Sequence, residues 1–195
     1  MSPVNGYVRA SAVLLFLCLL QLPACSSLPR MSVPRDPLTA EEHVALGTAY
    51  EAQGLKDLAV REFQAALEQR KDYPPALISL GNLSFDAGAL AEAETYYRRV
   101  LESDSSQPSA NNNLAMVYLQ RGERLGEAER LARTALEQGG PLKPYVLDTL
   151  ANIYLRQGRP RKAEEALDEA EALAPPNNTT LRARLTKTRQ ELTQH

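Results

Sequence analysis

The sequence predicts an all-α fold built from stacked pairs of helices. From residue 40 onward, residues of the same kind recur about every 34 positions, with Leu-Gly or Leu-Ala pairs at 46–47, 80–81, 114–115 and 150–151. Glycines follow these pairs, and alanines follow the glycines, at 59, 93, 128 and 163. A period of this length is typical of solenoids, whose units bury their apolar faces only against neighbouring units. The abundance of Ala, Leu, Glu and Arg favours helix.

Each unit is predicted as two helices joined by a glycine turn, with alanines that allow the two helices to approach closely. The four units span residues 40–73, 74–107, 108–143 and 144–177. The third unit carries one extra residue in its turn and another in the loop before the fourth unit. Residues 178–195 are predicted as a capping helix, because apolar positions fall on one face and the others are polar. Asn178 or Thr179 can cap its start.

These features resemble the tetratricopeptide repeat, and the resemblance covers residues 40–177. It implies a right-handed superhelical solenoid of four helix-turn-helix repeats plus a C-terminal capping helix. It also implies a concave groove, lined by the first helix of each repeat, in which a partner lies as an extended peptide or a helix.

The first 24 residues have the three parts of a secretory signal peptide. Arg9 gives a basic start, residues 12–22 are apolar, and Ala24 precedes Cys25 at the expected cleavage site. The apolar run of about eleven residues is shorter than the ~20 needed to cross a bilayer, so a cleaved signal is favoured over a permanent anchor.

The segment from Leu22 to Cys25 resembles a bacterial lipobox, in which the cysteine thiol receives a diacylglycerol and becomes the new N-terminus. Pro23 departs from the small or β-branched residue that is usual there. The resemblance implies lipidation of Cys25 and a firm anchor of three acyl chains. The alternative is an ordinary secretory signal that contains a cysteine.

Residues 25–39 are predicted as a tether, since three prolines in this stretch favour an extended spacer over a helix. From Ser26 to Leu38, at ~3.1 Å per residue, the spacer would reach roughly 40 Å. Ser26 stands where an aspartate would favour retention at the inner membrane in similar lipoproteins. The resemblance therefore implies an outer-membrane anchor facing the periplasm.

The resemblance also places groove-facing positions on the first helix of each repeat. In the first two repeats these are Val44, Thr48, Glu51, Ile78, Asn82, Phe85 and Asp86, and in the last two they are Asn112, Asn113, Met116, Leu119, Gln120, Asp148, Thr149, Asn152, Leu155 and Arg156.

Two kinds of side chain stand out among these positions. Asn82, Asn113 and Asn152 could hold a peptide backbone, because a carboxamide both donates and accepts; they could equally serve solubility and local hydrogen bonds. Phe85, Met116, Leu119 and Leu155 could form an apolar floor or pack between helices. A clamp for a C-terminal carboxylate is not expected, since the positions that need basic residues hold Ile78, Tyr145 and Thr149.

Several classes of function are disfavoured. The only cysteines, Cys18 and Cys25, lie near the N-terminus, and the only histidines are His43 and His195, so no Cys/His metal site is expected. No phosphate-binding glycine loop or paired nucleophile and base occurs, so neither an enzyme nor a cofactor is predicted. The formal net charge of −2 gives no case for nucleic acid.

The expected function is that of a membrane-anchored adaptor that binds another envelope protein in its groove. The sequence resembles tetratricopeptide lipoproteins of type IV pilus biogenesis, which implies a part in assembling a secretin as one option. Two alternatives stay open. The chain could dock a separately encoded envelope enzyme, or its repeats could associate with one another.

Overall fold

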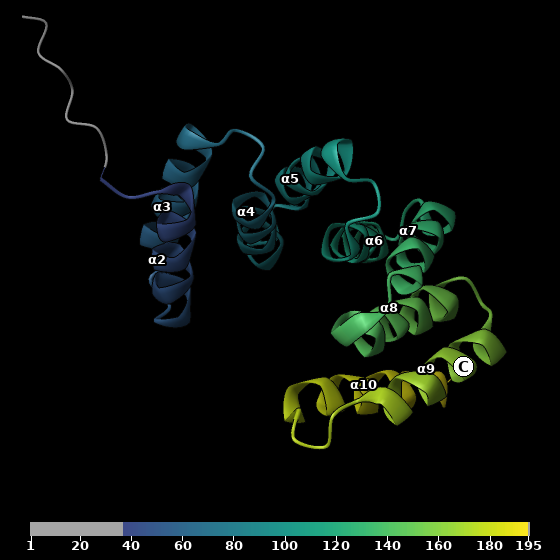
Figure 1. Ribbon diagram of the computed structural model, residues 1–195. Helices are drawn as coiled ribbons and strands as arrows, with labels where there is room; N and C mark the ends of the chain where they lie inside the picture. The colour runs from purple at the N-terminus through teal and green to yellow at the C-terminus, as the bar shows by residue number, and fades with distance from the viewer. Residues whose placement is uncertain (1–36, 195) are drawn as a thin grey trace, which may run out of the picture. The chain divides into compact units, whose positions relative to one another are not determined.

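The computed structural model describes residues 37–194, in which nine α-helices and one short 3-10 helix occur without any strand (Figure 1). The predicted signal peptide, Cys25 and the tether up to residue 36 lie outside the described residues. The helices are α2 (Ala40–Ala52), α3 (Lys56–Gln69), α4 (Pro74–Asp86), α5 (Leu90–Ser103), α6 (Pro108–Arg121), α7 (Leu125–Glu137), η2 (Gly140–Leu142), α8 (Lys143–Arg156), α9 (Pro160–Leu173) and α10 (Thr179–Leu192).

Local sequence signals account for where six of the described helices begin, namely α2, α4, α6, α8, α9 and α10. Thr39 caps α2 in a reciprocal arrangement with Glu42, whose carboxylate accepts from the Thr39 amide at 2.7 Å. Prolines stand in the first turn of α4, α6, α8 and α9, where a missing N–H costs little. The predicted cap of α10 is confirmed at Asn178, whose side chain accepts from the Leu181 amide at 3.0 Å.

A glycine with positive φ ends the first helix of every pair, at φ values from 68° to 76°. In three pairs a single residue separates this glycine from the next helix, whereas Glu123 and Arg124 both follow Gly122. Arg124 occupies this added position with a φ of 51°, which is uncommon for a residue other than glycine. Its guanidinium carbon lies 5.4 Å from the centroid of the Tyr118 ring, a contact that favours this conformation.

The helices pack in a regular order. Each first helix packs on its own second helix, and each second helix packs on the first helix of the following pair. In addition, α2, α4, α6 and α8 contact one another in succession, and α10 contacts both α8 and α9. The last helix therefore occupies the place that a fifth first helix would take (Figure 1).

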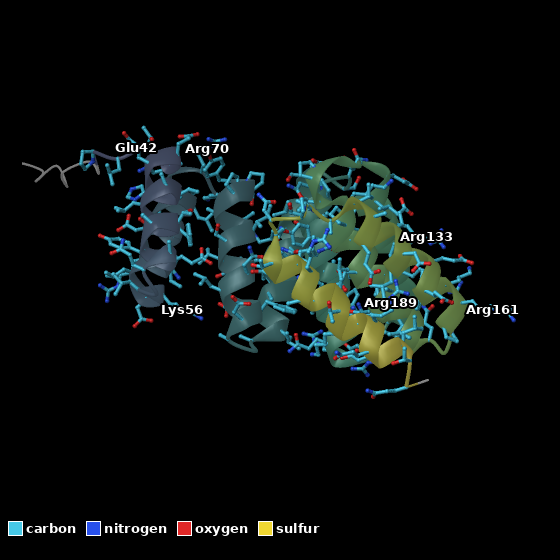
Figure 2. The ribbon with its side chains drawn as sticks, turned by 90° about the horizontal axis from the view of Figure 1, so that it is seen from below. Glu42, Lys56, Arg70, Arg133, Arg161 and Arg189 are labelled. Carbon is cyan, nitrogen blue, oxygen red and sulfur yellow. The ribbon has the colours of Figure 1, made fainter. Side chains whose placement is uncertain are left out.

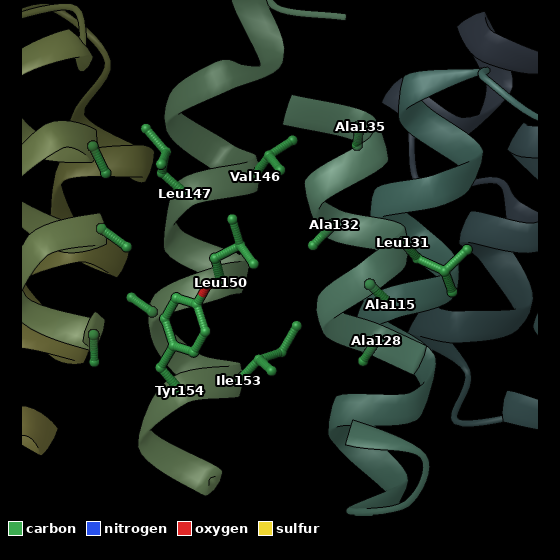
Figure 3. Close-up of a cluster of buried hydrophobic side chains, with 14 of the residues drawn as sticks. Ala115, Ala128, Leu131, Ala132, Ala135, Val146, Leu147, Leu150, Ile153 and Tyr154 are labelled. Atoms are coloured by element: carbon green, nitrogen blue, oxygen red, sulfur yellow. The ribbon is translucent and has the colours of Figure 1, made fainter. Parts of the chain in front are cut away.

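The core lies between the two helices of each pair and between neighbouring pairs. Figure 3 shows part of this core, where Val146 and Ile153 of α8 point toward the alanines of α7. In the first two pairs a glycine of the first helix faces a buried aromatic ring of the second, Gly47 with Phe63 and Gly81 with Tyr97. The equivalent positions of the last two pairs hold alanine opposite Ala132 or Leu167.

Charged side chains project outward from the second helices and the pair ends, as Lys56, Arg133 and Arg161 do in Figure 2. Among the helices that the structure describes, none combines the length and apolar character needed to cross a bilayer.

Candidate partner-binding groove

Two adjacent hollows lie on the side formed by the first helices of the pairs. The smaller has a volume of about 360 Å³ and is lined by α2, α4, α5 and α6, with Leu142, Tyr145 and Arg184 at its far side. The larger has a volume of about 600 Å³ and lies between α6, α8 and α10, with Phe85 of α4 at its edge. Both are lined by Phe85, Met116 and Arg184, so the two hollows lie side by side, and together they are called the groove below.

Most of the residues predicted for the groove line one of these hollows. Those in the smaller hollow are Glu51, Asn82, Phe85, Asp86, Asn112, Asn113 and Met116, and those added by the larger are Leu119, Gln120, Asp148, Thr149, Asn152, Leu155 and Arg156. Val44, Thr48 and Ile78 line neither. Val44 and Ile78 are half-buried against core clusters, and the Thr48 hydroxyl donates to the Val44 carbonyl at 2.8 Å.

The asparagines are bound within the chain. The Asn82 Oδ1 atom accepts from the Tyr97 hydroxyl at 2.9 Å and from Asn113 Nδ2 at 2.8 Å, which ties α4 to α5 and α6. Burial raises the pKa of Tyr97, so its hydroxyl keeps the proton that it donates. Asn152 Nδ2 donates to the Asp148 carbonyl at 2.8 Å and to Thr188 Oγ1 at 3.1 Å. These contacts give the asparagines a structural role in joining neighbouring helices.

The floor of the groove is apolar. Phe85 and Leu119 are half-buried and pack against the large core cluster, and Leu155 is a buried member of that cluster. Met116 is half-buried between the two hollows. Phe85, Leu119 and Leu155 therefore pack in the core and also line the groove, which combines the two roles that the sequence left open.

The capping helix supplies one wall of the larger hollow with Arg184, Lys187, Thr188 and Glu191, and the turn after it adds Gln194. Asp148, whose side chain is only 2% exposed, joins this wall to α8. Its carboxylate accepts from Arg184 Nη2 and from Thr188 Oγ1, each at 2.8 Å. The sequence predicts α10 as a solvated cap, and the structure adds a part in the groove through the packing of this helix on α8.

Two clusters of hydrogen-bonded and charged side chains, each centred on a glutamate, join neighbouring helix pairs on the outer side. Glu94 of α5 accepts from Arg98 at 2.9 Å, from the Tyr118 hydroxyl at 2.9 Å and from Arg121 at 2.6 Å. Glu129 of α7 is bound in the same way by Arg133, Tyr154, Gln157 and Arg159. Partial burial opposes ionisation of both carboxylates, but the hydrogen bonds and arginine charges outweigh it and hold each pKa below its usual value.

These lowered pKa values predict that replacing both glutamates by glutamine destabilises the protein by an amount that depends on pH. A group whose pKa is depressed by folding stabilises the protein above its unfolded-state pKa, about 4.3 for glutamate, and loses that effect as the pH falls below it. We expect Glu94→Gln/Glu129→Gln to cost about 1 kcal/mol at pH 7, since hydrogen bonds to charged groups are lost and the site is partly solvated. The difference in melting temperature from the wild type should shrink between pH 5 and pH 3.

Thermal unfolding followed by circular dichroism checks this expectation. Glu164→Gln/Glu165→Gln is the matched control, because both carboxylates lie on α9 and are exposed. A difference that stays constant down to pH 3 would show that the two clusters do not hold their glutamates ionised.

The sequence matches known models of a repeat family over the residues that form this array. Two models of the tetratricopeptide repeat match the sequence, over residues 44–108 and 106–175, and together they cover more than half of the chain. No curated protein sequence matches.

Solved structures with a similar fold share low sequence identity. The chain superposes on the structure titled "Crystal structure of APC/C hetero-tetramer Cut9-Hcn1" with a TM-score of 0.66 at 20% identity, covering 77% of this chain but 30% of that one. For the pilF protein of Pseudomonas aeruginosa the TM-score is 0.63 at 21% identity, with coverage of 82% and 74%. For the MamA protein it is 0.60 at 17% identity, with coverage of 80% and 90%.

The predicted fold class is confirmed as an all-α right-handed superhelical solenoid, with four helix-turn-helix repeats and a C-terminal capping helix. Sequence matches across the array, together with helix pairs stacked in this order, establish that the chain belongs to the tetratricopeptide repeat family.

Proposed function

We propose that this chain is a scaffold of the bacterial cell envelope, held at the membrane by a lipid on Cys25, that binds a segment of another envelope protein in its groove. The observation that carries the proposal is that two hollows lie side by side along the first helices and share Phe85, Met116 and Arg184. Proteins built from this repeat generally bind protein partners and are typically non-enzymatic.

The lining of the groove suits a peptide or a helix. Half-buried apolar side chains form the floor, and charged or amide side chains form the walls, a distribution that is typical of specific protein interfaces. An extended groove open along its length accepts a chain segment, whereas an enclosed pocket would accept a small molecule. The partner contacts are assigned to the groove-lining residues given above, with Phe85, Met116 and Leu119 as the apolar centre.

Placement in the envelope rests on the N-terminal sequence, and the fold shared with pilF of Pseudomonas aeruginosa is consistent with it. We assign the anchor to the outer membrane, facing the periplasm, and the partner to an envelope machine such as a pilus secretin. Cys25→Ser should release the chain from the membrane fraction and abolish incorporation of labelled palmitate. Cys18→Ser, which lies within the apolar run, should leave both unchanged. Loss of label in both variants, or in neither, would contradict lipidation at Cys25.

Binding in the groove is tested by affinity capture from envelope extract. Phe85→Ser/Met116→Ser should abolish retention of the partner, because it removes apolar contacts at the junction of the two hollows. Leu55→Ser/Leu58→Ser is the matched control, since it changes two exposed apolar residues outside the groove.

The outcome separates the candidate functions. A partner retained by the wild type and the control, but lost by the groove variant, would support the scaffold function and identify the envelope machine to which the partner belongs. Retention of an enzyme would identify a docking subunit, and recovery of the chain itself would identify self-association. Equal retention by all three proteins, with unchanged circular dichroism, would exclude the groove as the binding surface.

A further inference from the structure

The smaller hollow carries uncompensated negative charge. Glu51 at the end of α2 and Asp86 at the end of α4 both line it. No salt bridge reaches either carboxylate from the residues that the structure describes. Arg184 lines the same hollow, but its charge is balanced by the buried carboxylate of Asp148. Within the described part of the chain, the hollow therefore lacks a cation of its own that would neutralise Glu51 and Asp86.

A buried hydrogen-bond acceptor in the same hollow has no donor. Asn112 is 7% exposed, and its Oδ1 atom makes no hydrogen bond within residues 37–194. Its amide nitrogen has only two long contacts, to Asn113 Oδ1 at 3.3 Å and to Met116 Sδ at 3.6 Å. Leaving such an acceptor unpaired costs free energy. The Oδ1 atom is enclosed in the free chain, so the Asn112 carboxamide must turn toward the hollow that it lines for a donor of a bound partner to reach it.

Aromatic rings complete this environment. Phe85 and Tyr145, both half-buried, line the hollow beside the two carboxylates, whereas the Tyr97 ring is 1% exposed and offers no face to a ligand. A planar guanidinium stacks on aromatic faces, donates in several directions, and is more weakly hydrated than an ammonium ion. Carboxylates, an unpaired amide oxygen and aromatic rings together match an arginine side chain best, with lysine as the lesser fit.

The other end of the groove has the opposite charge. Arg156 and Lys187 line the larger hollow, and Lys187 is 79% exposed with only a 3.8 Å contact to Glu191. Between the two ends lies the apolar floor formed by Phe85, Met116, Leu119 and Leu155. The groove thus runs from an acidic end over an apolar centre to a basic end.

We propose that the groove recognises the order of charges in its partner: an arginine enters the smaller hollow between Glu51, Asp86 and Asn112, apolar side chains follow on the floor, and acidic side chains meet Arg156 and Lys187. This inference rests on the proposed function and specifies the partner segment. Complementary charge at both ends fixes the register and direction of the bound segment, because the reversed placement brings like charges together.

Selection from a random library of 12-residue peptides displayed on phage tests the charge order. The bait is the full-length chain purified in detergent, as the wild type, as Glu51→Gln/Asp86→Asn and as Phe85→Ser/Met116→Ser. Peptides enriched on the wild type should carry arginine or lysine separated from acidic residues by apolar ones. Asp57→Asn/Glu68→Gln is the matched control, because these exposed carboxylates lie on α3 away from both hollows.

Calorimetry on the best peptide then isolates the arginine contact. Replacing its arginine by citrulline, which keeps the shape and removes the charge, should weaken binding to the wild type roughly tenfold or more. The same replacement should have no further effect on Glu51→Gln/Asp86→Asn. Asn112→Ala should weaken binding of the arginine peptide more than that of the citrulline peptide.

The results distinguish this inference from the proposed function. Enriched peptides that depend on Phe85 and Met116 but lack a basic residue, or that bind Glu51→Gln/Asp86→Asn equally well, would overturn the charge order and leave groove binding intact. Peptides that bind all baits alike, or no enrichment on the folded wild type, would overturn both.

Discussion

Alanine at Gly47 is expected to destabilise the array by about 2 kcal/mol, although alanine is the better helix former. A Cβ atom at this position would lie 2.6 Å from Cε1 of Phe63, whose side chain is fully buried. Overpacking a core costs about 1–3 kcal/mol, and the gain in helix propensity of up to about 1 kcal/mol offsets only part of a clash this close.

The fourth repeat indicates how the clash can be relieved. It has alanine at the position equivalent to Gly47 and Leu167, fully buried, at the position equivalent to Phe63. Phe63→Leu alone should cost about 1 kcal/mol through lost volume. Gly47→Ala/Phe63→Leu should be little less stable than Phe63→Leu, with a coupling energy of about 1–2 kcal/mol.

Urea unfolding followed by circular dichroism measures this cycle. Gly126→Ala is the matched control, because Gly126 is also helical but a Cβ atom added there would meet no atom within 4 Å, so alanine should be neutral or stabilising. Additive losses in the double variant, or equal effects of Gly47→Ala and Gly126→Ala, would contradict the close packing of Gly47 on Phe63.

The fold can be predicted from the sequence because its signals are local and repeated. The turn glycines, the prolines in first helical turns and Asn178 define helix ends without tertiary information. The recurring small and large residues then fix which faces of the helices meet. The added residue in the third turn is visible as a longer spacing, but only the structure shows that Arg124 adopts the left-handed conformation there.

The groove is less completely predictable. A repeat period shows on which face of its helix a residue lies, but not which other side chains pack over that residue. The period assigns Asp148 to the groove, yet this residue is almost fully buried beneath Arg184 and Thr188. Val44 and Ile78 are assigned to the same face but pack into core clusters. Whether these positions contact a partner stays a prediction.

Sequence reasoning misses the part played by α10, because its polar sequence is typical of a solvated cap. One signal could have found it. The helix follows α9 as α8 follows α7, so the rule that assigns groove positions to first helices extends to it. The charge order of the groove depends on this helix, since Lys187 lies on it.

Removing Arg184 is expected to give the largest loss of stability among charged positions in the groove. Arg184→Met leaves the Asp148 carboxylate, 2% exposed, without its cation. Breaking a buried ion pair from one side costs about 3–5 kcal/mol, and because Arg184 is itself 42% exposed we expect about 2–3 kcal/mol. Lys187→Met is the matched control on the same helix and should change stability by less than about 0.5 kcal/mol, since the ion-pair partner of Lys187, Glu191, is half exposed.

A second substitution identifies the cause. Asp148→Asn in the Arg184→Met background removes the uncompensated charge and keeps the side-chain shape, so it should restore about half of the loss or more. If the loss came instead from apolar packing of the arginine stem, Asp148→Asn would restore nothing. Urea unfolding of the single and double variants decides between these causes.

Hydrogen exchange would localise the effect. In a repeat array each unit is stabilised mainly by its neighbours, so a terminal helix can open without unfolding the rest. Amides of α10 should therefore exchange faster in Arg184→Met, while those of α4 and α5 keep their protection. Because α10 forms one wall of the larger hollow, its opening would also weaken a partner bound at the basic end of the groove. Faster exchange spread evenly over the array would instead show that the Asp148–Arg184 pair stabilises the solenoid as a whole.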